Sequence, residues 1–189
     1  MEYRNVFLTF GLIPTKVFAF ENLYTFVTYM FIHSDPFHLF GNMLFLFIFG
    51  NFCEPSTGHL RFLAIYVASG MLGVFPHLLF FSTSNVPCVG ASGAIFGIIG
   101  AYPVLFPLKP SGPRHAIIPP IVGIPAFVLF ATLVSLYNPS IGVLIHIGGF
   151  ITGLAATRIM FPQTEGLLWA FVESLAGILI PDTEEEESD

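Results

Sequence analysis

Five long apolar stretches constrain the fold of this chain more than any other feature of its sequence. They lie at residues 37–53, 60–81, 90–107, 117–136 and 141–161. Each stretch is close to the ~17–25 residues that a helix needs to cross the hydrocarbon core of a bilayer. A backbone in lipid must satisfy its own hydrogen bonds, which a helix does within a single segment. We therefore predict an all-α, polytopic membrane helical bundle with five recognisable spans.

The charge content agrees with this prediction and argues against other classes of protein. Only 10% of the 189 residues are charged and 54% are hydrophobic, whereas soluble proteins average about 25% charged residues. A soluble enzyme, a nucleic-acid-binding protein and a disordered chain all need more charge than this. We expect the lipid bilayer to surround the chain, and we expect no nucleic-acid partner.

Two segments follow the last apolar stretch. Residues 162–181 contain an apolar run at 166–180 with Glu173 in its middle. At ~1.5 Å per residue this run is short for a span, so we predict an interfacial helix, with a sixth span as the alternative. Six of the 12 acidic residues fall within residues 182–189. We predict that this acidic segment is a disordered, solvated tail, and it implies no substrate.

The basic residues predict the orientation in the membrane. If the five spans alternate, the basic residues that share one side are Arg61, Lys109, Arg114 and Arg158, and those on the other are Arg4 and Lys16. The positive-inside rule makes the first side cytoplasmic. This predicts an integral, multi-pass protein of the cell membrane with a cytoplasmic C-terminal tail.

The same topology places residues 1–36 outside, as an outer loop region. Residues 6–13 are apolar but too short to cross the bilayer. We therefore expect either that this region is translocated unaided or that a membrane helix preceding it is absent from this chain.

Polar groups at the start of the first apolar stretch form one candidate site, since polar residues within a membrane are costly and usually functional. Asp35 can cap a helix that begins at Pro36. His38 and Asn42 are four residues apart and would share one face of that helix. His33 lies just before it. The alternative interpretation is a set of interfacial polar residues that only caps the helix.

A second candidate is the serine at the outer start of the third stretch. Ser92 lies between Gly90 and Gly93. Gly93 and Gly97 form a face of small residues that allows another helix to approach closely. A serine that only packs at a glycine-rich interface is the alternative.

A third candidate lies in the last stretch, where His146, Gly149 and Gly153 share one helical face. His146 and Ser92 lie at similar depths, in the outer third of the membrane. A histidine and a serine on two matching glycine faces predict a nucleophile and its general base, with His38 and Asn42 as donors to an oxyanion.

The sequence lacks the residues that other classes of intramembrane protease require. No histidine is followed by glutamate, as the His-Glu-x-x-His motif of metalloproteases requires, and no pair of aspartates lies within the spans. Asp35 is better explained as a cap than as a third catalytic group. We therefore predict a Ser-His dyad that needs no metal and no cofactor.

The ordered set of these motifs closely resembles the rhomboid intramembrane serine proteases. The set is His33-x4-His38-x3-Asn42, then Gly90-x-Ser92-Gly93, then His146-x2-Gly149-x3-Gly153. The resemblance covers about residues 10–162 and implies a rhomboid-like transmembrane catalytic domain at 37–161. The family has six core helices, so its first helix is the one expected to be absent.

The resemblance also implies roles for individual residues. Ser92 would be the nucleophile and His146 the general base. His38, Asn42 and the Ser92 backbone N–H would form the oxyanion hole. Supporting positions are His33, Gly90, Gly93, Phe96, Gly149 and Gly153; Phe96 stands where the family often has a tyrosine packed on the catalytic imidazole. The substrates implied are transmembrane proteins, cleaved in or next to their membrane segments.

Two other functions remain as alternatives. One is a catalytically inactive rhomboid-like protein that binds clients, and the presence of both Ser92 and His146 argues against it. The other is a small transporter, which needs polar groups along a path through the membrane. His77 is the main polar candidate elsewhere, but it also lies near an outer end.

Overall fold

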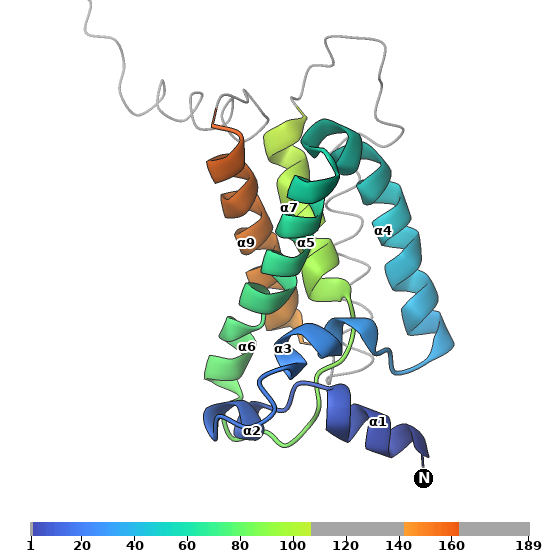
Figure 1. The fold of residues 1–189 in the computed structure, drawn as a ribbon, viewed down its shortest axis with the longest axis vertical. Coiled ribbons are helices and arrows are strands. Elements are labelled where there is room, and N and C mark those ends of the chain that lie inside the picture. Colours follow the sequence, from blue (N-terminus) through green and yellow to red (C-terminus); the bar gives the residue numbers. More distant parts are fainter. Residues whose placement is uncertain (1, 107–141, 163–189) are drawn as a thin grey trace, which may run out of the picture.

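The computed structural model describes residues 2–106 and 142–162, and these ranges fold into helices joined by turns (Figure 1). The described helices, including one 3₁₀ helix (η1), are α1 (Glu2–Phe10), α2 (Pro14–Phe18), α3 (Thr25–Thr28), η1 (Tyr29–Phe31), α4 (Pro36–Thr57), α5 (His59–Gly73), α6 (Phe75–Phe80), α7 (Ser92–Leu105) and α9 (Val143–Met160). The predicted span at 117–136 lies outside the described residues, as do the acidic tail and nearly all of the predicted interfacial helix.

Three described segments are long and apolar enough to cross a membrane: α4, the α5–α6 pair over His59–Phe80, and α9; α7 is a shorter apolar helix. Large apolar side chains of these helices face outward, with Phe37, Phe47 and Leu60 exposed by 87%, 69% and 84%. Water would penalise this exposure, whereas lipid does not. The predicted all-α membrane helical bundle is therefore confirmed for the described part of the chain.

Helix α7 occupies the centre of the bundle, packed between α5 and α9 and against α4 (Figure 1). Every residue from Gly93 to Val104 is buried. Glycines allow this close packing: a Cβ atom on Gly149 of α9 would collide with the Gly93 carbonyl, and one on Gly153 with the Gly97 carbonyl. The backbones of α7 and α9 are therefore in direct contact, as in small-residue packing between membrane helices.

The start of α4 has the predicted cap. Asp35 is extended, at φ −160° and ψ 166°, and its side chain accepts a hydrogen bond from the His38 N–H, with Pro36 as the first helical residue. The bond satisfies one of the amides that a helix start leaves unpaired. The prediction of this cap is confirmed, and it fixes where His38 enters the helix.

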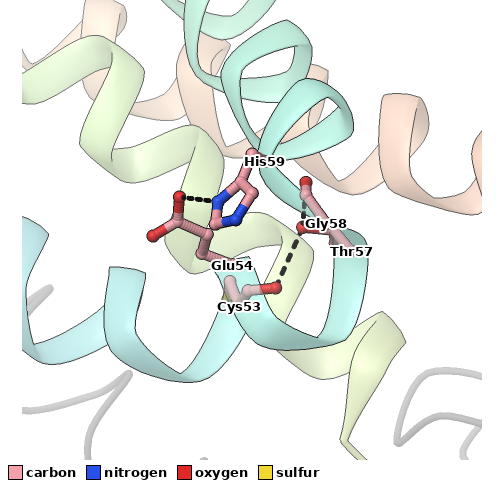
Figure 2. Close-up of polar contacts among 5 residues, drawn as sticks. All are labelled: Cys53, Glu54, Thr57, Gly58 and His59. Atoms are coloured by element: carbon pink, nitrogen blue, oxygen red, sulfur yellow. Dashed lines mark hydrogen bonds and ion pairs between the residues drawn. The ribbon is translucent and has the colours of Figure 1, made fainter.

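Helix α4 runs beyond the apolar stretch that ends at residue 53. It continues through Pro55 to Thr57, and it ends at Gly58, which has a φ of +78°. Pro55 removes only one backbone donor, whereas Gly58 supplies the positive φ that stops the helix. Figure 2 shows this corner, where Thr57 Oγ1 donates to a carbonyl one turn earlier at 2.9 Å and His59 Nδ1 lies 2.7 Å from Glu54 Oε1.

The second predicted span, 60–81, is broken into two helices. Helix α5 ends at Gly73 and α6 begins at Phe75, with Val74 between them. Pro76 has no N–H and so cannot bond the carbonyl four residues earlier, which favours a break at this point. After this break, α6 packs against α9.

The N-terminal region, predicted to be an outer loop, contains short helices and packs at the end of the bundle where α7 begins. Leu12 and Cys88 exchange both backbone hydrogen bonds, at 3.0 and 2.8 Å. The Tyr29 carbonyl accepts from the Gly90 N–H at 2.9 Å, and the Tyr29 hydroxyl donates to the Gly70 carbonyl at 2.7 Å. This region therefore holds the segment that leads into Ser92. Its location outside the membrane stays a prediction.

Candidate active site

Ser92 and His146 are brought together although 54 residues separate them in the chain. Ser92 is the first residue of α7, and His146 lies in the first turn of α9. The distance from His146 Nε2 to Ser92 Oγ is 2.8 Å, within hydrogen-bond range. His146 is buried and Ser92 is partly exposed. The pair can therefore exchange a proton while the hydroxyl stays open to a ligand.

The segment before Ser92 is held in a conformation that needs glycine. Gly90 has a φ of +122°, and a Cβ atom there would lie 2.8 Å from His38 Cε1 and 2.9 Å from His38 Nε2. A side chain at this position would therefore be strained and would displace the His38 ring. The absent side chain lets the His38 imidazole of α4 lie against the segment that leads into Ser92.

The imidazole of His146 is oriented by an aromatic ring on the facing helix. Phe96 lies one turn after Ser92 on α7, and its ring stacks on His146 with centroids 4.4 Å apart and an interplanar angle of 13°. The stacked ring covers one face of the imidazole and restricts its rotation. Phe96 therefore lies beside the His146 ring, where the family resemblance implies an aromatic residue.

His38 and Asn42 lie one turn apart on α4, as predicted from their spacing. The Asn42 side chain is 7% exposed, and its Nδ2 donates to the His38 carbonyl at 2.9 Å. An amide nitrogen carries two hydrogens, so a second donor remains on Asn42. On His38, the Ser34 N–H donates to Nδ1 in a long hydrogen bond of 3.5 Å, and Nε2 faces Gly90.

His33 packs against His38 and does not contact the Ser–His pair. The two rings meet edge to face with centroids 5.2 Å apart. Burial, and then the nearby His38, lower the pKa of His33, so its ring is neutral near pH 7. Among the described residues, its buried Nε2 has no hydrogen-bond partner. The edge-to-face contact fits a supporting role, in which the His33 ring helps to hold the His38 ring in place.

Asp35 is committed to the cap. Its carboxylate accepts from the His38 N–H at 2.9 Å and from the Ser34 hydroxyl at 2.8 Å. These two donors hold the pKa of the Asp35 carboxyl below its usual range. The described contacts of the His146 ring are with Ser92 and Phe96.

Some residues near the site carry no signal in the sequence. Ser34 reaches His38 Nδ1 with its hydroxyl oxygen, at 3.1 Å, and Tyr29 binds the segment before Ser92 through its backbone. Both contacts follow from the folding of the N-terminal region, which has no simple periodicity. Within the described ranges, no group of three or more His, Cys, Asp or Glu side chains is placed to hold a metal ion.

Comparisons with known proteins agree with the motif order. The family model described as "Rhomboid domain" matches residues 21–163. The "Putative rhomboid protease YdcA" of Bacillus subtilis is 33% identical over 141 residues, which cover 74% of this chain and 68% of that protein. "Rhomboid protease GluP" of the same organism is 36% identical over 94 residues, or 50% of this chain and 18% of that protein.

One similar protein carries a different description. "Inactive RHOMBOID-like protein 8" of Arabidopsis thaliana is 36% identical over 81 residues, or 43% of this chain. The matched segment spans only 22% of that plant protein. Similarity to these relatives therefore includes both a protease and a protein described as inactive.

Proposed function

The chain belongs to the rhomboid family, and we propose that it is an intramembrane serine endopeptidase that works by a Ser92–His146 dyad. Its substrates are transmembrane proteins, cleaved at peptide bonds in or next to their membrane segments. The observation that carries the proposal is the 2.8 Å contact between His146 Nε2 and Ser92 Oγ. Hydroxyl and imidazole at this distance are the pair that acyl transfer requires.

In the proposed mechanism, His146 Nε2 takes the Ser92 hydroxyl proton as Oγ attacks the carbonyl carbon of the scissile bond. The resulting tetrahedral intermediate carries its negative charge on the former carbonyl oxygen. When the C–N bond breaks, the proton on His146 passes to the leaving amine. Water, activated in turn by His146, then hydrolyses the acyl-enzyme and restores the Ser92 hydroxyl.

Three donors are proposed to stabilise the oxyanion. The Ser92 N–H lies in the first turn of α7, where a helix leaves its amides unpaired and its dipole favours negative charge. His38 presents Nε2 toward the segment before Ser92, and the proposed role requires the tautomer that carries its proton on this nitrogen. Asn42 contributes its second amide hydrogen. Donors fixed in a site that excludes water act mainly on the transition state.

A catalytically inactive, client-binding protein is the competing function, supported by the similarity to the inactive plant relative. The contact between a serine and a histidine, with a phenyl ring stacked on the histidine, supports activity instead. Client binding by itself would not need this arrangement.

Proteolysis of a model transmembrane substrate in liposomes tests the proposal. We expect the chain to cut the substrate and Ser92→Ala to lose at least about 10⁴-fold of the activity, because the covalent route is removed. Both proteins should elute identically in detergent, which controls for folding. Equal cleavage by the two proteins, or none by either, would contradict the proposed function.

A further inference from the structure

His77 is a buried polar residue that the proposed mechanism does not use. It lies on α6, the short helix that follows the break after Gly73, and its ring packs on Phe81 with centroids 4.8 Å apart. Its Nδ1 is buried and has no hydrogen-bond partner in the described part of the chain. A histidine kept in such a position needs an explanation.

The imidazole of His77 contacts two segments that lead to the two catalytic side chains. On one side, Nε2 lies 3.1 Å from the Cys88 thiol, four residues before Ser92. On the other side, a Cβ atom on Gly142 would lie 3.1 Å from Nδ1. Gly142 is the N-cap of α9, four residues before His146.

Each contacted segment has backbone hydrogen bonds of its own and lies four residues before Ser92 or His146. The Cys88 backbone is held by Leu12 on its other side, at 2.8 and 3.0 Å, so the thiol contact adds a second fixed point. The Gly142 carbonyl accepts from the His146 N–H at 3.2 Å. A shift of His77 would therefore be passed along a short piece of backbone to Ser92 and to His146.

The Cys88 thiol is suited to a structural contact with His77. Cys88 is 4% exposed, and burial raises the pKa of its thiol to about 12. The group is therefore a neutral S–H, a weak donor that can point at an imidazole lone pair. This burial argues against a reactive or regulatory cysteine at this position.

From this geometry we infer that His77 is a positioning residue, which sets the spacing of Ser92 and His146 by bridging Cys88 and Gly142. The inference rests on the proposed function. His77 reaches no reacting atom; it acts through the two segments that it separates. Helix α6 packs against α9 (Figure 1), and its His77 ring lies beside both Cys88 and Gly142.

The test measures the rate per active site, so that loss of folded protein does not affect it. End-point labelling with a fluorophosphonate counts the competent sites, and cleavage of the model substrate is then divided by that count. A displacement of ~1 Å in a catalytic pair can cost about 10²-fold, so we expect His77→Leu to lower kcat per site about tenfold or more while KM changes less than about twofold.

Two further variants test whether the effect of His77→Leu comes from the lost position of this ring and not simply from the loss of a histidine. His77→Gln retains a polar atom near the place of Nε2, which can accept from the thiol, and should keep kcat within about threefold. His59→Leu removes an exposed histidine at the α4–α5 corner (Figure 2), where the partner is Glu54. An exposed ion pair contributes little, so this control should stay within about twofold.

A double substitution tests whether His77 acts through the thiol. If the two residues form one unit, Cys88→Ala combined with His77→Leu should be no slower than His77→Leu alone. If His77→Leu does not fold, Cys88→Ala carries the test by itself, with Cys53→Ala as the matched control. Cys53 is also buried, but its thiol donates to the Ile98 carbonyl at 3.6 Å.

The possible outcomes show whether the positioning role of His77 fails alone or together with the proposed function. Failure of the unsubstituted chain to react with fluorophosphonate would overturn both. Normal labelling of that chain, with equal kcat per site for His77→Leu and His59→Leu, would overturn only the positioning role of His77. A rise in KM without a fall in kcat would also overturn it, because that result would make His77 a substrate-binding group.

Discussion

Ser92 and His146 are the residues that react in the proposed mechanism, and their neighbours hold them in place. Gly90 gives the approach to Ser92 a backbone angle of +122°, and Phe96 covers one face of the His146 ring at 4.4 Å. Neither neighbour carries a group that transfers a proton. Substitutions there should alter geometry, whereas substitutions of the pair should remove the chemistry.

The dyad predicts that no carboxylate completes a triad. Asp35→Asn retains a side-chain oxygen for the His38 N–H, and asparagine is as good an N-cap as aspartate. Proteolytic activity measured in liposomes should therefore survive within about tenfold. Loss on the scale of His146→Ala would make Asp35 a catalytic partner and would refute the dyad.

The oxyanion donors predict a particular kinetic signature. His38→Ala and Asn42→Ala should each lower kcat far more than they raise KM, since such donors act on the transition state and are worth roughly 10²–10³-fold in a soluble protease. Steady-state kinetics on the model substrate measure the two constants separately. If KM alone rises for either variant, that residue binds substrate and is not an oxyanion donor.

At the scale of helices, we expect the contact between α7 and α9 to set the distance between Ser92 and His146. The Gly149 position touches the Gly93 carbonyl directly, so Gly149→Leu should push α9 away and lower the rate by about 10²-fold or more. Ile151→Leu is the matched control, because Ile151 lies on the same helix and is 59% exposed. The two variants are compared by cleavage rate per fluorophosphonate-labelled site. Full activity in Gly149→Leu would mean that the contact does not set the catalytic geometry.

Sequence reasoning succeeded where one local pattern decides the structure. Apolar runs of membrane length predicted the helical bundle, and the Asp35–Pro36 pair predicted the start of α4, because a cap depends on adjacent residues. The spacing of His38 and Asn42 predicted their shared face. The glycine patterns of α7 and α9 indicated a close approach, and the structure brings those faces into contact.

The same reasoning missed features that depend on tertiary packing. The apolar stretch in the sequence ends at residue 53, yet α4 runs on through Pro55 and stops only at Gly58, because a proline inside a helix removes one backbone donor whereas the glycine supplies a positive φ. The short helices before residue 32 have no clear periodicity. The bridging position of His77 depends on two distant segments, and a single sequence gives no signal for such a contact.

At the scale of the whole molecule, the predicted topology places the candidate site near the outer face. Ser34 and Ser56 lie close to opposite ends of α4, so single cysteines at these positions should react from opposite sides of the membrane. A membrane-impermeant maleimide added to intact cells should label Ser34→Cys, whereas Ser56→Cys should need permeabilised cells. Both native cysteines are buried and free, which keeps background labelling low.

The reverse labelling pattern would invert the orientation and move the site to the cytoplasmic face, although the Ser–His chemistry would be unchanged. Labelling of both positions from one side would contradict the assignment of α4 as a membrane span. Each outcome therefore separates the predicted orientation from the helical fold.

The reaction of the purified chain with a fluorophosphonate tests the Ser92–His146 dyad most directly, because it needs neither a known substrate nor a known orientation. We expect one phosphonyl group per chain, located on Ser92 by mass spectrometry of peptides. Ser92→Ala should show no labelling, and His146→Ala should be slowed by roughly 10³-fold or more because the hydroxyl loses its base. No reaction of the unsubstituted chain, or equal labelling after Ser92→Ala, would contradict the proposed protease.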